Sequence, residues 1–164
     1  MDARIIERPA FRLIGHAVRV PLIHEGVNPH IQHFVASLPV AEHERLKQLS
    51  VTDPACLLQV SAQGDPDYAE GSELTYMHGV AVDVGADVPP DLQEIKVAGG
   101  TWVVLRTIGE YPSSLQSANA ASAAEWFPSN PWRLRPGPSF VAVLGRAADF
   151  STATCDLWFP IERA

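Results

Sequence analysis

Aromatic side chains are the residues of this 164-residue chain whose type most directly suggests ligand chemistry. Stacked rings hold flat molecules, and the face of a ring attracts a cation. A histidine in a strand can add a hydrogen bond. The candidate ligand contacts are Phe34, Tyr76, His78, Trp102, Trp126, Phe140 and Trp158. Packing in a core explains an aromatic residue equally well, and spacing alone does not separate the two interpretations.

A carboxylate beside an aromatic residue is the candidate for acid–base chemistry. Glu125 is the one charged side chain between Tyr111 and Trp126. An apolar pocket would raise the pKa of its carboxyl group and make it a general base near neutral pH. A solvated place at a helix end is the alternative, and it leaves Glu125 without a catalytic role. Cys56 and Cys155 have no neighbouring base in the sequence, so both are expected to be reduced and buried.

Histidine spacing gives little support for a metal. His30 and His33 are three residues apart in a predicted helix, close enough to share a face. No carboxylate or cysteine completes a recognised ligand set around them, and His24 and His43 are expected to face solvent. We therefore expect no metal. The glycines of "AGG" and "GTW" are not followed by a phosphate-binding loop, so no cofactor is expected either.

Charge and hydropathy exclude two classes of partner. The formal net charge is −7, and the twelve lysines and arginines are scattered, whereas a nucleic-acid surface needs them clustered. No stretch is long and apolar enough for a membrane span. The N-terminal "MDARIIERPAF" carries charges where a signal peptide would need an apolar run. We expect a cytoplasmic protein that binds neither nucleic acid nor membrane.

The elements that must position the candidate residues follow from hydrophobic periodicity. In the first half we expect two strands within residues 4–20, interrupted by Pro9. Asn28 can cap a helix that begins at Pro29, and a second helical piece follows Pro39. Strands are expected over 55–63 and 74–84, joined by a polar loop.

The second half repeats this order after the proline-rich turn "GADVPPDLQ". Strands are expected on both sides of the Gly-Gly turn within residues 94–109. A helix follows over 111–127, capped by Ser113 and built mostly from small, uncharged residues. Strands over 139–145 and 154–163 close the chain. The small residues of this helix leave room for something to lie against it.

These two patterns predict an α+β fold of two pseudo-twofold-related βαββ units. The units would pair into one antiparallel sheet with a helix from each half. We expect a single domain over residues 1–164, with halves of about 1–88 and 89–164. A central ligand pocket is expected at the pseudo-twofold axis, because repeat interfaces favour concavities.

Four short motifs, in order and spacing, resemble the gyrase-inhibitor-like (GyrI-like) domain, which also serves as the effector-binding domain of AraC-type and multidrug-responsive regulators. The family pattern is a Gly-Pro-Tyr-like turn, a helix that ends in Trp-Leu-Pro, a Gly-Pro before a strand, and a closing strand that ends in Pro-Val. Here the matching residues are Gly109-Glu110-Tyr111, Trp126-Phe127-Pro128, Gly137-Pro138 and Phe159-Pro160-Ile161. The first half, with "HGVAVDV" before the proline-rich turn, also looks like the family, so the resemblance covers nearly the whole chain.

The resemblance implies a central pocket for lipophilic, often cationic, small molecules. Many members carry a glutamate in the strand after Gly-Pro, and Val141 occupies that position here, so a cation would lack this counter-charge. Aromatic stacking can still hold a flat neutral compound. Some relatives look like hydrolases that open cyclopropane rings of DNA-alkylating compounds, which would give Tyr111 and Glu125 catalytic roles.

The sequence thus predicts a binder that senses or sequesters a hydrophobic aromatic small molecule, as a monomer or homodimer. A detoxifying hydrolase that uses the same pocket is the alternative. Binding to a protein such as a topoisomerase is a third hypothesis, which no specific residue supports.

Overall fold

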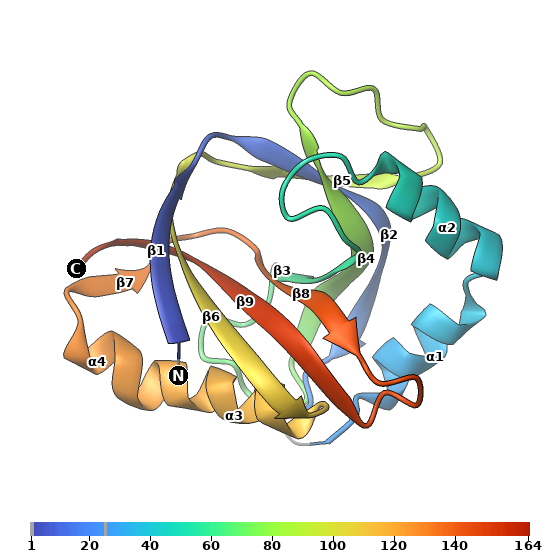
Figure 1. Cartoon of the computed structure of the whole chain (residues 1–164). Helices are drawn as coiled ribbons and strands as arrows, with labels where there is room; N and C mark the ends of the chain where they lie inside the picture. The colour runs from blue at the N-terminus through green and yellow to red at the C-terminus, as the bar shows by residue number, and fades with distance from the viewer. Residues whose placement is uncertain (1, 25) are drawn as a thin grey trace.

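One strongly curled antiparallel sheet with helices on one side makes up the computed structural model, which describes residues 2–24 and 26–164 (Figure 1). The strands are β1 (Asp2–Arg8), β2 (Phe11–Pro21), β3 (Leu58–Ala62), β4 (Glu73–Asp83), β5 (Gln93–Val97), β6 (Gly100–Glu110), β7 (Trp132–Leu134), β8 (Ser139–Arg146) and β9 (Thr152–Arg163). The helices are α1 (Pro29–Ser37), α2 (Val40–Leu49), α3 (Ser113–Ala121) and α4 (Phe127–Ser129), with a π-helical turn over Ser122–Trp126. The predicted α+β class is confirmed.

In the first half, prolines and a capping residue correctly predicted where strands and helices begin or end. The chain breaks between β1 and β2 at Pro9, which lacks the N–H that a strand interior needs. The Asn28 side chain caps α1 by accepting hydrogen bonds from the backbone N–H groups of His30 and Ile31. Pro39 separates α1 from α2.

The helix of the second half differs from its prediction in two ways. The predicted cap at Ser113 is wrong: α3 begins at that residue, and the Ser113 hydroxyl donates to the Glu110 carbonyl oxygen. The expected continuous helix changes to a π-helical turn at Ser122, whose buried hydroxyl donates to the Asn119 carbonyl oxygen at 2.6 Å. A hydrogen bond from a side-chain hydroxyl to a backbone carbonyl competes with the backbone hydrogen bonds of a regular α-helix. The three-residue strand β7, which pairs with β9, was not predicted.

Strand order reveals the expected pseudo-twofold arrangement with an exchange at its edges. The order is β1-β6-β9-β8-β3-β4-β2-β5, so β2-α1-α2-β3-β4 corresponds to β6-α3-β8-β9 about an axis between β3 and β8. The edge strands are swapped. β1 pairs with β6 of the second half, and β5 pairs with β2 of the first half.

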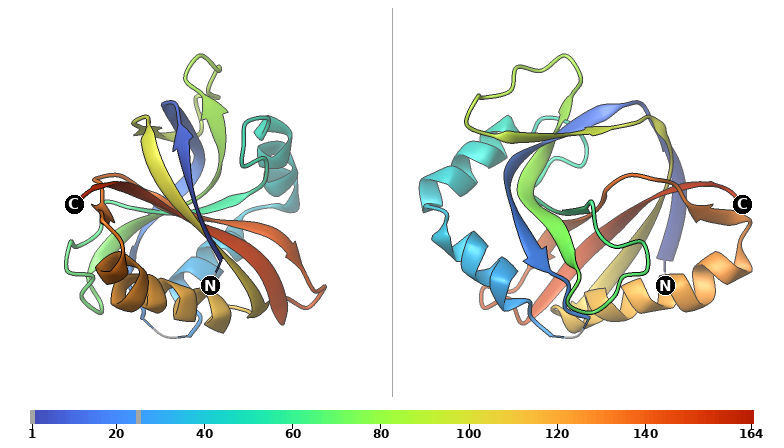
Figure 2. Two further views of the ribbon diagram at one scale, coloured as in Figure 1. Left: turned by 60° about the vertical axis from the view of Figure 1, so that its left-hand side comes forward. Right: turned by 180° about the vertical axis from the view of Figure 1, so that it is seen from behind.

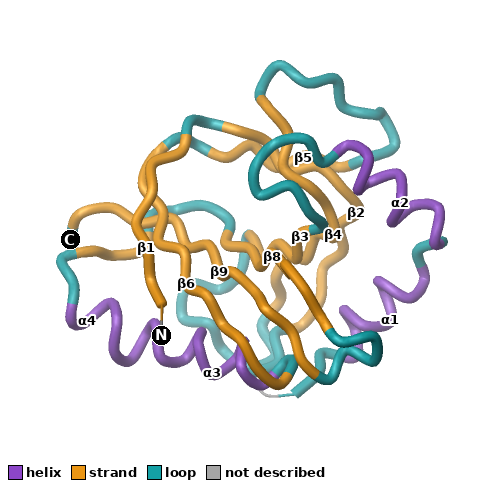
Figure 3. The backbone as a smooth tube through the Cα atoms, viewed as in Figure 1, coloured by secondary structure: helices purple, strands orange, loops and turns teal. Residues whose placement is uncertain are grey.

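The two faces of the sheet have different coverings (Figure 2). On one face, both edges curl around a common core, since Ile6 of β1 and Ile95 of β5 pack against the same buried cluster. On the other face lie the helices (Figure 3). α1 and α2 pack on β2 and β4, and α3 packs on β6 and β9. In the sheet, the middle strands β3 and β8 therefore lie between the strands that α1 and α2 cover and the strands that α3 covers.

Candidate functional site

A strip of polar and small side chains runs along β3 and β8 on the helix-bearing face, and we call it the seam strip. It consists of Gln59, Ser61, Ser139 and Val141, with Gln59 opposite Val141 and Ser61 opposite Ser139. Ser61 is exposed and the other three are half-buried. The flanking strands carry buried residues on this face, such as Val80 and Leu157. The sheet is thus accessible along the line where its two halves meet.

A cavity of about 470 Å³ opens at the Ser61–Ser139 end of the seam strip. Leu22, Leu74 and the loop after Ser61 line it from the first half of the chain. The segment after β7 and the end of β9, with Phe159 and Pro160, line it from the second half. This cavity lies where the pseudo-twofold arrangement predicts one, at the junction of the two repeats.

Aromatic residues border the strip on the α1 side. Tyr76 lies opposite Ser61 in the β3–β4 register, and its ring meets that of Phe34 edge to face at 6.3 Å. Burial, with a smaller contribution from the proximity of Tyr111, raises the pKa of Tyr76. Two predicted ligand contacts, Phe34 and Tyr76, are therefore brought together beside the seam strip. Neither of them lines the cavity itself.

Tyr111 reaches the strip from the turn between β6 and α3. The Gln59 amide donates to the Tyr111 hydroxyl at 3.0 Å, and the hydroxyl lies 3.3 Å from the amide oxygen. Its ring packs against Phe150 with centroids 5.0 Å apart. Burial raises the pKa of Tyr111, so the hydroxyl is protonated at neutral pH. The pair joins the two halves of the molecule by an uncharged polar contact.

Three of the predicted ligand contacts lie on the opposite face of the sheet. Trp102, Phe140 and Trp158 are almost fully buried in the main core, at 0%, 2% and 2% exposure. The Phe140 and Trp158 rings stack at 5.3 Å and 20°, and Trp102 meets Trp158 at 6.0 Å. These contacts are those of a packed core, and a ligand would have to open it to reach the rings.

Trp126 and Glu125 lie near the C-terminal end of the α3 layer. Trp126 is half-buried and meets Phe127 edge to face at 5.0 Å within the apolar cluster under that layer. Glu125 is exposed on the π-helical turn. The apolar surroundings that the general-base prediction requires for its carboxyl group are therefore missing.

His78 belongs to a polar cluster under α2. It is 7% exposed, and its Nε2 lies 2.9 Å from Nδ1 of His43. Burial first, then the proximity of His43 and His16, lowers the pKa of His78 to about 4. His16 in turn contacts the Glu42 carboxylate at 2.7 Å. The expectation that His43 faces solvent is wrong, because its helix packs on β4 and its ring meets His78.

Among the residues that the structure describes, the other two histidines weighed as metal ligands, His30 and His33, are not part of a cluster of ligating side chains. His30 and His33 are both exposed on α1. Over residues 2–24 and 26–164, no group of three or more metal-ligating side chains is placed to hold an ion. Within the same residues, no helix is long and apolar enough to cross a membrane.

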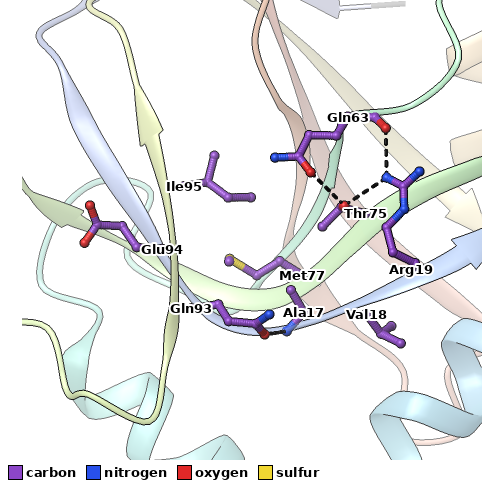
Figure 4. Close-up of a pocket in the computed structure, with 9 residues that line it drawn as sticks. All are labelled: Ala17, Val18, Arg19, Gln63, Thr75, Met77, Gln93, Glu94 and Ile95. Carbon is purple, nitrogen blue, oxygen red and sulfur yellow. Dashed lines mark hydrogen bonds between the residues drawn. The ribbon is translucent and has the colours of Figure 1, made fainter.

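A second, smaller pocket of about 240 Å³ lies at the sheet edge between β2, β4 and β5 (Figure 4). Met77 and Ile95 give it an apolar floor. Its polar groups already bond to one another: Arg19 donates to Thr75 and to the Gln63 carbonyl oxygen, and the Ala17 backbone N–H donates to Gln93. The pocket offers little free hydrogen-bonding capacity.

Sequence reasoning missed the seam strip itself. Polar residues alternate with apolar ones in "LQVSA", which marks Gln59 and Ser61 as one face of β3. That alternation is ordinary for a sheet with one solvated face. Only the strand order, which puts β3 beside β8, turns it into a feature shared by both halves.

Comparisons with known proteins agree with this architecture. SAV2435, solved bound to tetraphenylphosphonium, is 18% identical; the match covers 99% of this chain and 94% of that one, with a TM-score of 0.74. The EcmrR C-terminal domain is 18% identical over 99% of this chain and 98% of its own, with a TM-score of 0.65. A hydrolase encoded by lin2189 from Listeria innocua is 13% identical; the match covers 98% of this chain and 91% of that one, with a TM-score of 0.51.

These likenesses show the fold. A search of curated proteins found no match to the sequence. The model of the GyrI-like small molecule binding domain matches residues 1–162, and the chain therefore belongs to that family.

Proposed function

We propose that this protein binds a lipophilic, aromatic small molecule at the seam strip and its adjoining cavity, and so senses or sequesters that compound. The observation that carries the proposal is the cavity of about 470 Å³ at the junction of the two repeats. Its size falls within the roughly 300–1,000 Å³ that ligand pockets occupy.

The lining of the cavity suits an apolar ligand with a few polar atoms. Leu22, Leu74 and Phe159 supply hydrophobic surface, and burial of apolar area is the main source of binding free energy for such a compound. Ser61 and Ser139 supply hydroxyl groups that can orient it. Tyr76, which is 4% exposed, and the half-buried Phe34 pack against each other beside Ser61, at the border of the site.

Family membership supports the same proposal. The family is one of small-molecule-binding domains, and SAV2435 was solved with tetraphenylphosphonium, a lipophilic compound with four phenyl rings. This gives a chemical starting point for a ligand screen of the present chain.

The hydrolase alternative rests on the Tyr111 hydroxyl, which reaches the seam strip and can hold a water molecule there. A protonated phenol would orient this water and would not deprotonate it, because burial raises the Tyr111 pKa. Two neighbours of the same fold are hydrolases from Listeria innocua. The exposed Glu125 would need a bound substrate to bring it to an apolar environment.

Calorimetric titration of the protein with lipophilic aromatic compounds tests the proposal. We expect saturable binding that Ser61→Phe weakens at least tenfold, since the added ring fills the mouth of the cavity. Ser117→Phe, at an exposed position on α3 outside the cavity lining, is the matched control and should bind as the wild type does.

Mass spectrometry of the recovered compound separates the two functions. A binder returns the compound unchanged, and a hydrolase returns it heavier by one water. Absence of saturable binding by a folded protein across the series would refute both.

A further inference from the structure

The titratable groups that border the seam strip are uncharged at neutral pH. Tyr76 and Tyr111 keep their protons because burial raises the pKa of both phenols. His78, which lies opposite Gln59 in the β3–β4 register, is neutral because its pKa is about 4. The strip itself consists of an amide, two hydroxyls and a valine. The site is thus locally neutral in a chain whose formal net charge is −7.

Two carboxylates outside the cavity lining, those of Glu42 and Asp156, are engaged by their own partners. Glu42 accepts hydrogen bonds from His16 and Arg45, which lower its pKa. Asp156 lies on the opposite face of the sheet and pairs with Arg106 and Arg4.

The cavity end carries one charge of each sign. The Asp65 carboxylate accepts hydrogen bonds from backbone N–H groups of its own loop, at Asp67 and Ala69. The Arg135 guanidinium donates to the carbonyl oxygens of Ile161 and Thr101. These two groups contribute no net charge to the lining.

We propose that the Gln59–Tyr111 pair is the specificity-determining element of the site, and that it selects neutral lipophilic compounds with a hydrogen-bond acceptor over lipophilic cations. This inference rests on the proposed function. It goes beyond that function by naming the ligand's charge and the polar group that recognises it.

Donor geometry favours an acceptor on the ligand. Both the Gln59 amide and the Tyr111 hydroxyl carry N–H or O–H groups, and they converge within 3.0 Å of each other. A carbonyl or phosphoryl oxygen that enters between them can accept from both. The pair then exchanges its mutual hydrogen bonding for two hydrogen bonds to the ligand, so both of these donors remain satisfied.

Desolvation disfavours a cation at the same place. A buried positive charge loses its hydration and needs a counter-charge close by to compensate for it. Val141, which lies opposite Gln59, offers none. Long-range attraction from a net charge of −7 is weakened by salt and does not replace a contact partner.

Two probes that share three phenyl rings on phosphorus test the inference: tetraphenylphosphonium, a cation with a fourth phenyl ring, and triphenylphosphine oxide, a neutral compound with a phosphoryl acceptor in its place. At 150 mM salt we expect the wild type to bind the oxide about tenfold more tightly. Gln59→Glu introduces a carboxylate at the strip and should reverse this order. Gln59→Leu should weaken the oxide alone.

Gln48→Glu is the matched control, since it adds the same charge at an exposed position on α2. It should leave both affinities unchanged. An equal gain for tetraphenylphosphonium in Gln48→Glu and Gln59→Glu would overturn the inference in favour of a general field effect.

The wild-type comparison does not depend on any variant folding. Tighter binding of tetraphenylphosphonium than of the oxide would overturn the neutral specificity and leave the proposed function intact. Failure of the folded wild type to bind either probe, or any other aromatic compound, would remove the proposed function itself.

Discussion

The middle strands β3 and β8 present two very different faces. Toward the core, Leu58, Val60 and Phe140 are at most 2% exposed and pack into one cluster with the buried tryptophans. Toward the helices, the alternate residues of the same strands form the seam strip, which is half-buried or exposed. A single pair of strands thus separates a packed core from an accessible site.

This contrast assigns stability and binding to opposite faces. Close-packed interiors lose several kcal/mol when a large side chain is removed, because a cavity remains. An open strip loses little, because water fills the space. Substitutions on the core face should therefore affect unfolding, and substitutions on the seam strip should affect ligand affinity. The following predictions test this separation, starting with the largest expected effect.

Trp158→Ala should lower the free energy of unfolding by about 4 kcal/mol. The residue is 2% exposed and stacks on Phe140, so its removal leaves a large cavity. Urea denaturation followed by circular dichroism measures the loss. Trp132→Ala is the matched control. Trp132 is half-buried on β7 beneath Arg163, so its replacement should lower the free energy of unfolding much less. Equal losses in the two variants would contradict the assignment of Trp158 to the core.

Acid should destabilise the first half through His78. The folded pKa of about 4 lies below the ordinary value of 6.5, so the fold favours the neutral ring. The corresponding stability is fully present above pH 6.5 and is lost as the pH falls toward 4, by on the order of 3 kcal/mol. We expect His78→Gln to remove this part of the pH dependence of unfolding.

Urea denaturation of both proteins between pH 7.5 and 4.5 provides the measurement. His33→Gln, at an exposed position on α1, should retain the wild-type slope. The same slope in wild type and His78→Gln would mean that burial under α2, together with the proximity of His43, does not hold His78 neutral.

Val141→Ala should change stability least, by about 1 kcal/mol or less, because the side chain is half-buried in the seam strip. The same variant should weaken the binding of triphenylphosphine oxide more clearly than it lowers the free energy of unfolding, since the proposed site places the ligand against this valine. Denaturation and calorimetry on the same sample compare the two effects. A large loss of stability without a change in affinity would place Val141 in the core instead.

Local signals predicted most elements of the fold but not which residues meet at the site. Pro9 and Asn28 act through the backbone groups beside them, so their effects are readable in sequence. Alternation put Trp102 and Trp158 on one face of their strands, and nothing in the alternation says which face the helices cover. The exchange of β1 and β5 depends on long-range pairing, which a period of two residues does not encode.

The candidate site was predicted in part for the same reason. Phe34, Tyr76 and Tyr111, which were predicted from the sequence, lie beside the seam strip. Gln59 was missed because its importance comes from Tyr111, which lies 52 positions away in the sequence. The aromatic type alone could not tell these residues from the core tryptophans.

A crystal structure of the protein with triphenylphosphine oxide would test the central claim most directly. We expect the phenyl rings to lie over Ser61 and Val141, with the phosphoryl oxygen within hydrogen-bond distance of Gln59 and Tyr111. Electron density for the compound in the pocket beside Met77 and Ile95, or among the tryptophans of the core, would contradict binding at the seam strip.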